Sequence, residues 1–235
     1  MNASPHGAPW TTELAYRMRH LFMLKLVGTT VLTTLFFVAY FQLLRHPEYP
    51  VATMPLTPLD ALVAFRPEAI FPYLSLWIYI GIGPGMQRDF RSLASCGSWM
   101  VAMCAAGLAI FHFWPTAVPP TAFDASGFFG FQLLQGIDAA GNACPSMHVA
   151  AAMFTVVRIE RVLRGIGAPR ALRAVNLIWF VAIAWSTLAT RQHVVLDVAG
   201  GAMLGIVFAL PSLHWKPRAH RISSNSEPTR KEKPS

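Results

Sequence analysis

Two histidines and one aspartate lie in or beside strongly apolar stretches of this 235-residue chain. His148 follows a Cys-Pro-Ser-Met segment, and His193 precedes Asp197 by four positions. Ionisable side chains are costly inside a membrane, so those found there are candidates for function. A helix would place His193 and Asp197 on one face, where the carboxylate would hold the imidazole in one tautomer and leave its other nitrogen basic.

The segment before His148 predicts the beginning of a helix, with Pro145 ahead of the turn and Ser146 as the N-cap. Free backbone N–H groups at a helix N-terminus favour an anion. Together with the two histidines, Asp197 and Arg191, this helix end would fit a phosphate group. One histidine would attack phosphorus and the other would protonate the departing oxygen, a scheme in which neither a metal nor another cofactor is expected.

The stretches around these residues are unusually apolar. Hydrophobic residues make up 54% of the chain and charged residues 13%, whereas soluble domains carry about 25% charged residues. Six stretches are long enough, at about 20 residues each, to cross a membrane: residues 21–44, 69–87, 93–114, 144–163, 171–190 and 194–213. We therefore expect an all-α polytopic integral membrane protein with six transmembrane helices.

The expected organisation has three parts. A cytoplasmic N-terminal segment covers residues 1–20, the six-span domain covers residues 21–214, and a basic disordered tail covers residues 215–235. Between the first two spans, residues 59–65 are apolar but too few to cross a membrane, which fits a re-entrant or interfacial segment.

Basic residues are distributed unevenly about the predicted spans. Most of the 19 lysines and arginines lie on one side, and the positive-inside rule makes that side cytoplasmic. Both termini are then cytoplasmic, and His148 and His193 lie at the outer face. Topology explains the basic excess, so no nucleic-acid partner is expected. The three cysteines are scattered, which argues against a CxxC zinc site or a disulfide scaffold.

Two short patterns resemble signatures of the type 2 phosphatidic acid phosphatase superfamily. The run from Pro145 to His148 resembles its Pro-Ser-x-His signature. Ser186, His193 and Asp197 resemble its Ser-Arg-x5-His-x3-Asp signature. The six-span layout is similar as well, with one signature opening the fourth span and the other at the junction of the fifth and sixth.

This resemblance implies a role for each matching residue. His193 would be the nucleophile that forms a phosphohistidine, Asp197 would orient it, and His148 would be the general acid. Ser146 and the backbone of Met147 would contact the phosphate. The resemblance also implies a phosphorylated membrane lipid as the substrate and partner, and a bacterial inner membrane with the active site facing the periplasm.

Three features depart from the superfamily's usual pattern. Its first signature, Lys-x6-Arg-Pro, is missing near the end of the third span, Thr187 stands where the third signature has Arg, and Met147 stands where Gly is usual. This combination is more similar to the branch that contains inositol-phosphorylceramide synthases and their bacterial relatives. Arg191 is our candidate for supplying the missing positive charge.

Several functions remain open on the sequence alone. Water as the acceptor would make the protein a lipid phosphate phosphatase, and an alcohol would make it a lipid phosphotransferase. We favour hydrolysis because it needs no second binding site. A transporter or proton relay would use the same three ionisable residues, although the internal repeats common in transporters are not evident. A non-catalytic lipid-binding scaffold would explain the missing Lys and Arg. The sequence does not indicate which lipid is bound or the oligomeric state.

Overall fold

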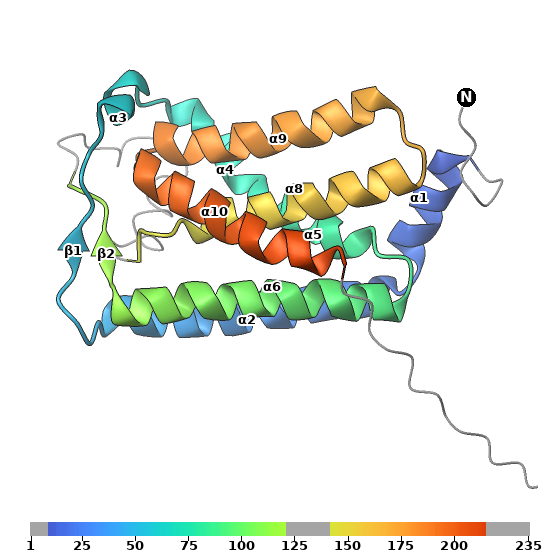
Figure 1. Ribbon diagram of the computed structural model, residues 1–235, viewed down its shortest axis with the longest axis horizontal. Coiled ribbons are helices and arrows are strands. Elements are labelled where there is room, and N and C mark those ends of the chain that lie inside the picture. Colours follow the sequence, from blue (N-terminus) through green and yellow to red (C-terminus); the bar gives the residue numbers. More distant parts are fainter. Residues whose placement is uncertain (1–8, 121–141, 215–235) are drawn as a thin grey trace, which may run out of the picture.

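The computed structural model describes residues 9–120 and 142–214, and within these ranges the chain is almost entirely helical (Figure 1). The predicted tail at 215–235 lies outside the described residues. A two-stranded parallel ribbon joins β1 (Ala52–Thr53) to β2 (Thr116–Ala117). The helices are α1 (Trp10–Arg19), α2 (Phe22–Arg45), α3 (Pro58–Leu62), η1 (Pro67–Ala69), α4 (Ile70–Leu74), α5 (Leu76–Gly85), α6 (Phe90–Phe113), α8 (Met147–Gly165), α9 (Arg170–Ala189) and α10 (Val195–Ser212).

The long helices run side by side, and α8 lies at the centre (Figure 1). Helix α8 packs against α5, α9 and α10, whereas α6 packs against α2 and α10. The first half of α8 buries small residues, so α10 can approach closely. A Cβ atom at Gly205 of α10 would lie 2.7 Å from the carbonyl oxygen of Ala150. This tight packing of α8 on α10 places the beginnings of both helices at the same end of the bundle.

Four helices in the described part of the chain are long and apolar enough to cross a membrane, namely α2, α6, α9 and α10. Large apolar side chains remain exposed on their outer faces, such as Leu35 at 61%, Ile178 at 66% and Met203 at 66%. Such surfaces would be unfavourable in water but suit contact with lipid chains. The four helices therefore indicate an integral membrane protein.

The other two predicted spans differ from simple long helices. Residues 69–87 form η1, α4 and α5 in succession, with a break at Ser75. The Ser75 hydroxyl donates to the carbonyl of Pro72 at 2.7 Å and accepts from the indole N–H of Trp179 at 2.9 Å. Helix α8 carries several charged residues in its second half: Arg158, Glu160, Arg161 and Arg164. The prediction of six spans is thus confirmed for four helices.

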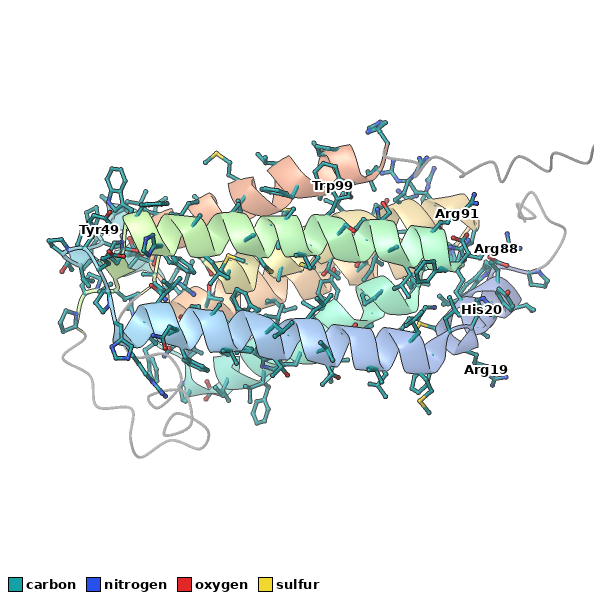
Figure 2. All side chains as sticks on the ribbon, turned by 90° about the horizontal axis from the view of Figure 1, so that it is seen from below. Arg19, His20, Tyr49, Arg88, Arg91 and Trp99 are labelled. Carbon is teal, nitrogen blue, oxygen red and sulfur yellow. The ribbon has the colours of Figure 1, made fainter. Side chains whose placement is uncertain are left out.

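The two ends of the bundle differ in charge. Figure 2 shows Arg19, His20, Arg88 and Arg91 together at one end and Tyr49 at the opposite end. We call the first the basic end; α1 and the turn between α8 and α9 also lie there (Figure 1). The opposite end holds α3, the β1–β2 ribbon and the beginnings of α8 and α10.

Candidate active site

Ser146 caps α8, as the sequence predicts. Its Oγ accepts the backbone N–H of Val149 at 3.3 Å, and the residue is fully buried. Its own backbone N–H donates to the carbonyl oxygen of Asp197 at 3.0 Å. A Cβ atom at Gly201 would collide with the Ser146 carbonyl oxygen. The start of α8 and the first turns of α10 are therefore in direct backbone contact, which brings together the two patterns that the sequence keeps far apart.

His148 lies in the first turn of α8 and is held by an aromatic neighbour. Its ring stacks on Tyr73 with the centroids 4.1 Å apart, and its Nε2 lies 3.1 Å from the Tyr73 carbonyl oxygen. Trp77 approaches the same ring from the side at 6.5 Å. Because a carbonyl oxygen can only accept, Nε2 carries a hydrogen in this contact. Nδ1 is then the nitrogen left for chemistry.

His193 lies outside α10, which begins only at Val195. The prediction that His193 and Asp197 share a helix is therefore wrong, although the two side chains still meet, with Nδ1 of His193 3.5 Å from Oδ2 of Asp197. The same Oδ2 accepts the backbone N–H of Val194 at 3.0 Å. The Asp197 carboxylate thus contacts the two residues just before α10: it accepts a hydrogen bond from Val194 and lies next to the His193 ring.

Asp197 is fully buried, and hydrogen bonds around the pair are incomplete. Among the described residues, Oδ1 of Asp197 and Nδ1 of His193 make no hydrogen bond. Buried polar atoms are normally hydrogen-bonded, and exceptions occur at catalytic sites. A shift of the imidazole toward Oδ2, by a few tenths of an ångström, would convert the 3.5 Å contact into a hydrogen bond.

The turn that carries His193 is built from the end of α9. The carbonyl oxygen of Thr187 accepts the backbone N–H groups of both Gln192 and His193 at 3.1 Å. Arg191 adopts a left-handed backbone conformation with φ of 60°, which reverses the chain. The hydroxyl of Thr187 donates to Ala184 within α9 at 2.8 Å. Thr187 therefore shapes the turn and does not replace the charge of the Arg expected at its position.

Arg191 and His193 line the same small cavity of about 80 Å³. Nη1 of Arg191 donates to the backbone carbonyl oxygen of Asp60 at 3.2 Å. Within the described residues, its Nε and Nη2 make no hydrogen bond. The rest of the wall is mostly apolar and includes Leu56 and Leu188. The cavity therefore combines a histidine, an available guanidinium and an apolar wall.

The two histidines lie at the same end of the bundle and are linked through Asp197. Its backbone carbonyl accepts the N–H of Ser146, two positions before His148, and its side chain contacts His193. The structure thus pairs His193 with Asp197, joins Asp197 to the start of the helix that carries His148, and lines one cavity with Arg191 and His193. The Met147 side chain turns away and reaches the space beside Gly107 of α6. Within the described residues, no group of three or more His, Cys, Asp or Glu side chains is placed to hold a metal ion.

Three residues around this site are not among the predicted site residues: Tyr73, Trp77 and Asp60. Asp60 lies in α3, and residues 59–65, predicted to be re-entrant or interfacial, contain four of the five residues of this short helix. The Thr-x-x-Asp pattern that ends at Asp60 is the signal of a capping box. It predicts a helix start but gives no indication of the contact with Arg191.

Comparison with known proteins gives one match. A family model described as the PAP2 superfamily matches residues 69–211, which run from α4 to the penultimate residue of α10 and include His148, His193 and Asp197 but not Asp60. No curated protein and no solved structure matches the chain.

Proposed function

The chain belongs to the PAP2 superfamily, and from this premise we propose that it is an integral-membrane lipid phosphate phosphatase that works through a phosphohistidine. Membership indicates a lipid phosphatase-type function, and the four apolar helices indicate a protein of the membrane. The observation that carries the proposal is the pairing of His193 with the buried Asp197 beside a cavity that Arg191 also lines.

The first step is attack by His193 on phosphorus. Asp197 lies next to Nδ1, so Nδ1 keeps its hydrogen and Nε2 carries the lone pair. Nε2 forms a bond to phosphorus while the bond between phosphorus and the lipid oxygen breaks. His148, protonated on Nδ1 and held through Nε2 by Tyr73, gives its Nδ1 proton to the departing oxygen. The lipid alcohol leaves, and the phosphoryl group stays on His193.

The second step regenerates the enzyme. A water molecule attacks the phosphohistidine, and His148, now neutral, takes one of its protons at Nδ1. The bond between Nε2 and phosphorus breaks, inorganic phosphate leaves, and both histidines return to their starting states. Such phosphoryl transfers depend mainly on positioning and on positive charge around the equatorial oxygens.

Arg191 and the beginning of α8 are the proposed phosphate-binding groups. Arg191 has Nε and Nη2 to donate. In the described part of the chain, the backbone N–H groups of Met147 and His148 make no hydrogen bond, whereas that of Val149 is capped by Ser146. Helix N-termini of this kind favour anions. The proposed contact therefore runs through the backbone of Met147, and Ser146 acts by shaping the helix start.

We further propose that α4–α5 and α8 complete a six-span topology as the second and fourth spans. The charged half of α8 is compatible with this because Arg158 is buried among polar partners. Its guanidinium donates to the Ser212 carbonyl at 3.0 Å and to Oε1 of Gln87 at 3.0 Å. Buried charges in membrane spans persist when they are paired in this way.

Orientation follows from the basic end, which the positive-inside rule assigns to the cytoplasm. Both termini then lie in the cytoplasm, and the site faces the opposite side. We propose a bacterial inner membrane, with the site at the periplasmic leaflet. A basic tail at 215–235 would add to the cytoplasmic charge.

A lipid phosphotransferase with the same residues is the second candidate. The apolar part of the cavity wall next to His193 would suit the carbon chain of an acceptor alcohol better than water alone. This reaction would replace water by that alcohol in the second step. It also corresponds to the branch with inositol-phosphorylceramide synthases.

The test is phosphate release in detergent micelles from phosphatidic acid, a polyprenyl pyrophosphate and phosphatidylglycerol phosphate. Each substrate is run with and without EDTA, and against His193→Ala. We expect release from at least one substrate that resists EDTA and disappears in the variant. If none releases phosphate, a labelled donor with diacylglycerol or ceramide as acceptor tests transfer. Failure of both would favour a non-catalytic lipid-binding protein.

A further inference from the structure

Asp60 belongs to α3, which precedes the family match, yet it contacts the turn that carries His193 on both sides. We infer that Asp60 is a positioning residue for His193: it holds residues 191 and 195 and thereby fixes the nucleophile between them. This inference rests on the proposed function for its catalytic meaning, and on the contacts below for its geometry.

The carboxylate of Asp60 uses its two oxygens for different tasks. Oδ2 accepts the backbone N–H and the hydroxyl of Thr57, each at 2.7 Å, which caps α3. Oδ1 accepts the backbone N–H of Val195 at 2.8 Å. The capping of α3 accounts for the hydrogen bonds to Oδ2 but not for the hydrogen bond to Oδ1. The hydrogen bond to Oδ1 comes from the first residue of α10, so it connects Asp60 to the segment next to His193.

The backbone of Asp60 adds a second contact on the other side of His193. Its carbonyl oxygen accepts from Nη1 of Arg191 at 3.2 Å. Arg191 lies two positions before His193, and Val195 lies two positions after it. One residue of α3 thus holds the turn at both of its ends, while Asp60, Arg191 and His193 line one cavity.

The turn needs an outside support. Arg191 is in the left-handed region with φ of 60°, which is uncommon for a residue other than glycine. The first N–H groups of any helix have no partner within the helix. At the start of α10, Asp197 satisfies the N–H of Val194 and Asp60 satisfies that of Val195. Two buried carboxylates therefore fix consecutive peptide groups directly after the nucleophile.

Burial and charge fit this role. Asp60 is 6% exposed, although its neighbour Leu62 is 79% exposed. Burial raises the pKa of the Asp60 carboxyl, but the hydrogen bonds from Thr57 and Val195 and the nearby Arg191 charge outweigh it, and the pKa is lowered. The group is then an anion at neutral pH and a strong acceptor for the Val195 N–H. A short exposed helix would not by itself need a buried carboxylate.

The test compares Asp60→Ala and Asp60→Asn with a matched control, Asp89→Ala. Asp89 is the N-cap of α6 at the basic end and accepts the N–H of Ser92 at 2.8 Å. Both alanine variants lose a helix cap, but only Asp60→Ala loses a contact with the His193 turn. Asp60→Asn keeps one oxygen acceptor, so it should recover part of the function.

Two measurements separate positioning from general stability. The first is kcat and KM for phosphate release from phosphatidic acid. We expect kcat of Asp60→Ala to fall about 10- to 100-fold with KM little changed, because small misplacements of reacting groups have effects of this size. Asp60→Asn should fall between Asp60→Ala and the parent protein. Asp89→Ala should keep its kcat while its thermal midpoint falls.

The second measurement needs no substrate. Diethyl pyrocarbonate modifies accessible imidazoles, and the His193 side chain is only 12% exposed. Peptide mass spectrometry should show faster labelling of His193 in Asp60→Ala than in the parent or in Asp89→Ala. Unchanged labelling together with unchanged kcat would overturn the positioning role. If the parent protein releases phosphate from none of the three substrates named above, the proposed hydrolysis fails, and the labelling rates alone decide the role of Asp60.

Discussion

The backbone N–H of Ser146 donates to the carbonyl oxygen of Asp197 at 3.0 Å. This bond joins the residue that caps α8 to the residue that pairs with His193. No side chain is needed for it, so it depends only on how closely α8 and α10 approach. The relative position of the two histidines is therefore set by backbone packing before any substrate binds, which is the preorganisation that catalysis requires.

Gly201→Ala should test this packing. A Cβ atom at that position collides with the Ser146 carbonyl oxygen, so α8 and α10 must separate. We expect a loss of stability of about 1–3 kcal/mol and a fall in phosphate release of at least about tenfold. Gly97→Ala in α6 is the matched control, because its Cβ would meet nothing within 4 Å. Equal behaviour of the two variants in thermal unfolding and activity would contradict the account.

Asp197→Asn should separate charge from structure at the buried carboxylate. The amide oxygen can still accept the N–H of Val194, which the carboxylate accepts at 3.0 Å, so the fold should persist. The variant loses the anion that stabilises the His193 imidazole in one tautomer. We expect kcat to fall about 10²- to 10⁴-fold, by analogy with orienting carboxylates beside catalytic histidines. A folded variant with kcat close to that of the parent would exclude an orienting role.

His148→Ala should show an effect that depends on the leaving group. An alkyl phosphate such as phosphatidic acid needs a proton on its departing oxygen, and loss of the general acid should cost about 10²- to 10⁴-fold in kcat. A p-nitrophenyl ester departs readily without that proton, so its release of nitrophenolate in a single turnover should change little. The ratio of the two rates is the measurement. A similar loss for both substrates would argue against a proton-donating role for His148.

Arg191→Gln should weaken phosphate binding. Hydrogen bonds to charged groups contribute about 1.5–3 kcal/mol each, so kcat/KM should fall about 10- to 100-fold. Arg191→Lys keeps the charge but loses the planar fork and should lie between. Arg45→Gln, at the end of α2 on the same side of the bundle, is the control and should retain activity. An unchanged substrate affinity in Arg191→Gln would show that Arg191 does not bind the phosphate. The start of α8 would then be the remaining proposed phosphate-binding group.

Local patterns predict the parts of the site that depend on neighbouring residues. Ser146 follows from a Pro-Ser start ahead of an apolar run, and its capping bond to Val149 is present. The His-x3-Asp spacing predicts that His193 and Asp197 meet, and they do. This spacing does not reveal that α10 starts after His193. The same spacing fits a helix that contains both residues and a helix that begins between them.

Contacts between distant segments account for the rest. Asp60 carries the signal of a helix cap, but its bond to Val195 joins residues 135 positions apart. Apolar length alone predicts a single span at 69–87, whereas Ser75 divides it by bonding to Pro72 and to Trp179 of α9. The polar partners of Arg158, Ser212 in α10 and Gln87 just after α5, lie 54 and 71 positions away in the sequence. These tertiary contacts determine the helix break at Ser75 and the burial of Arg158, which local hydropathy does not predict.

The central claim is that the phosphoryl group is carried by His193. The protein is mixed with phosphatidic acid, quenched in alkali after milliseconds to seconds, and digested for peptide mass spectrometry. We predict phosphate on Nε2 of His193 during turnover, its absence in His193→Ala, and its retention in His214→Ala, where the replaced histidine lies two positions beyond the end of α10. Turnover that continues with no phosphate on His193, or with phosphate on another residue, would contradict the account.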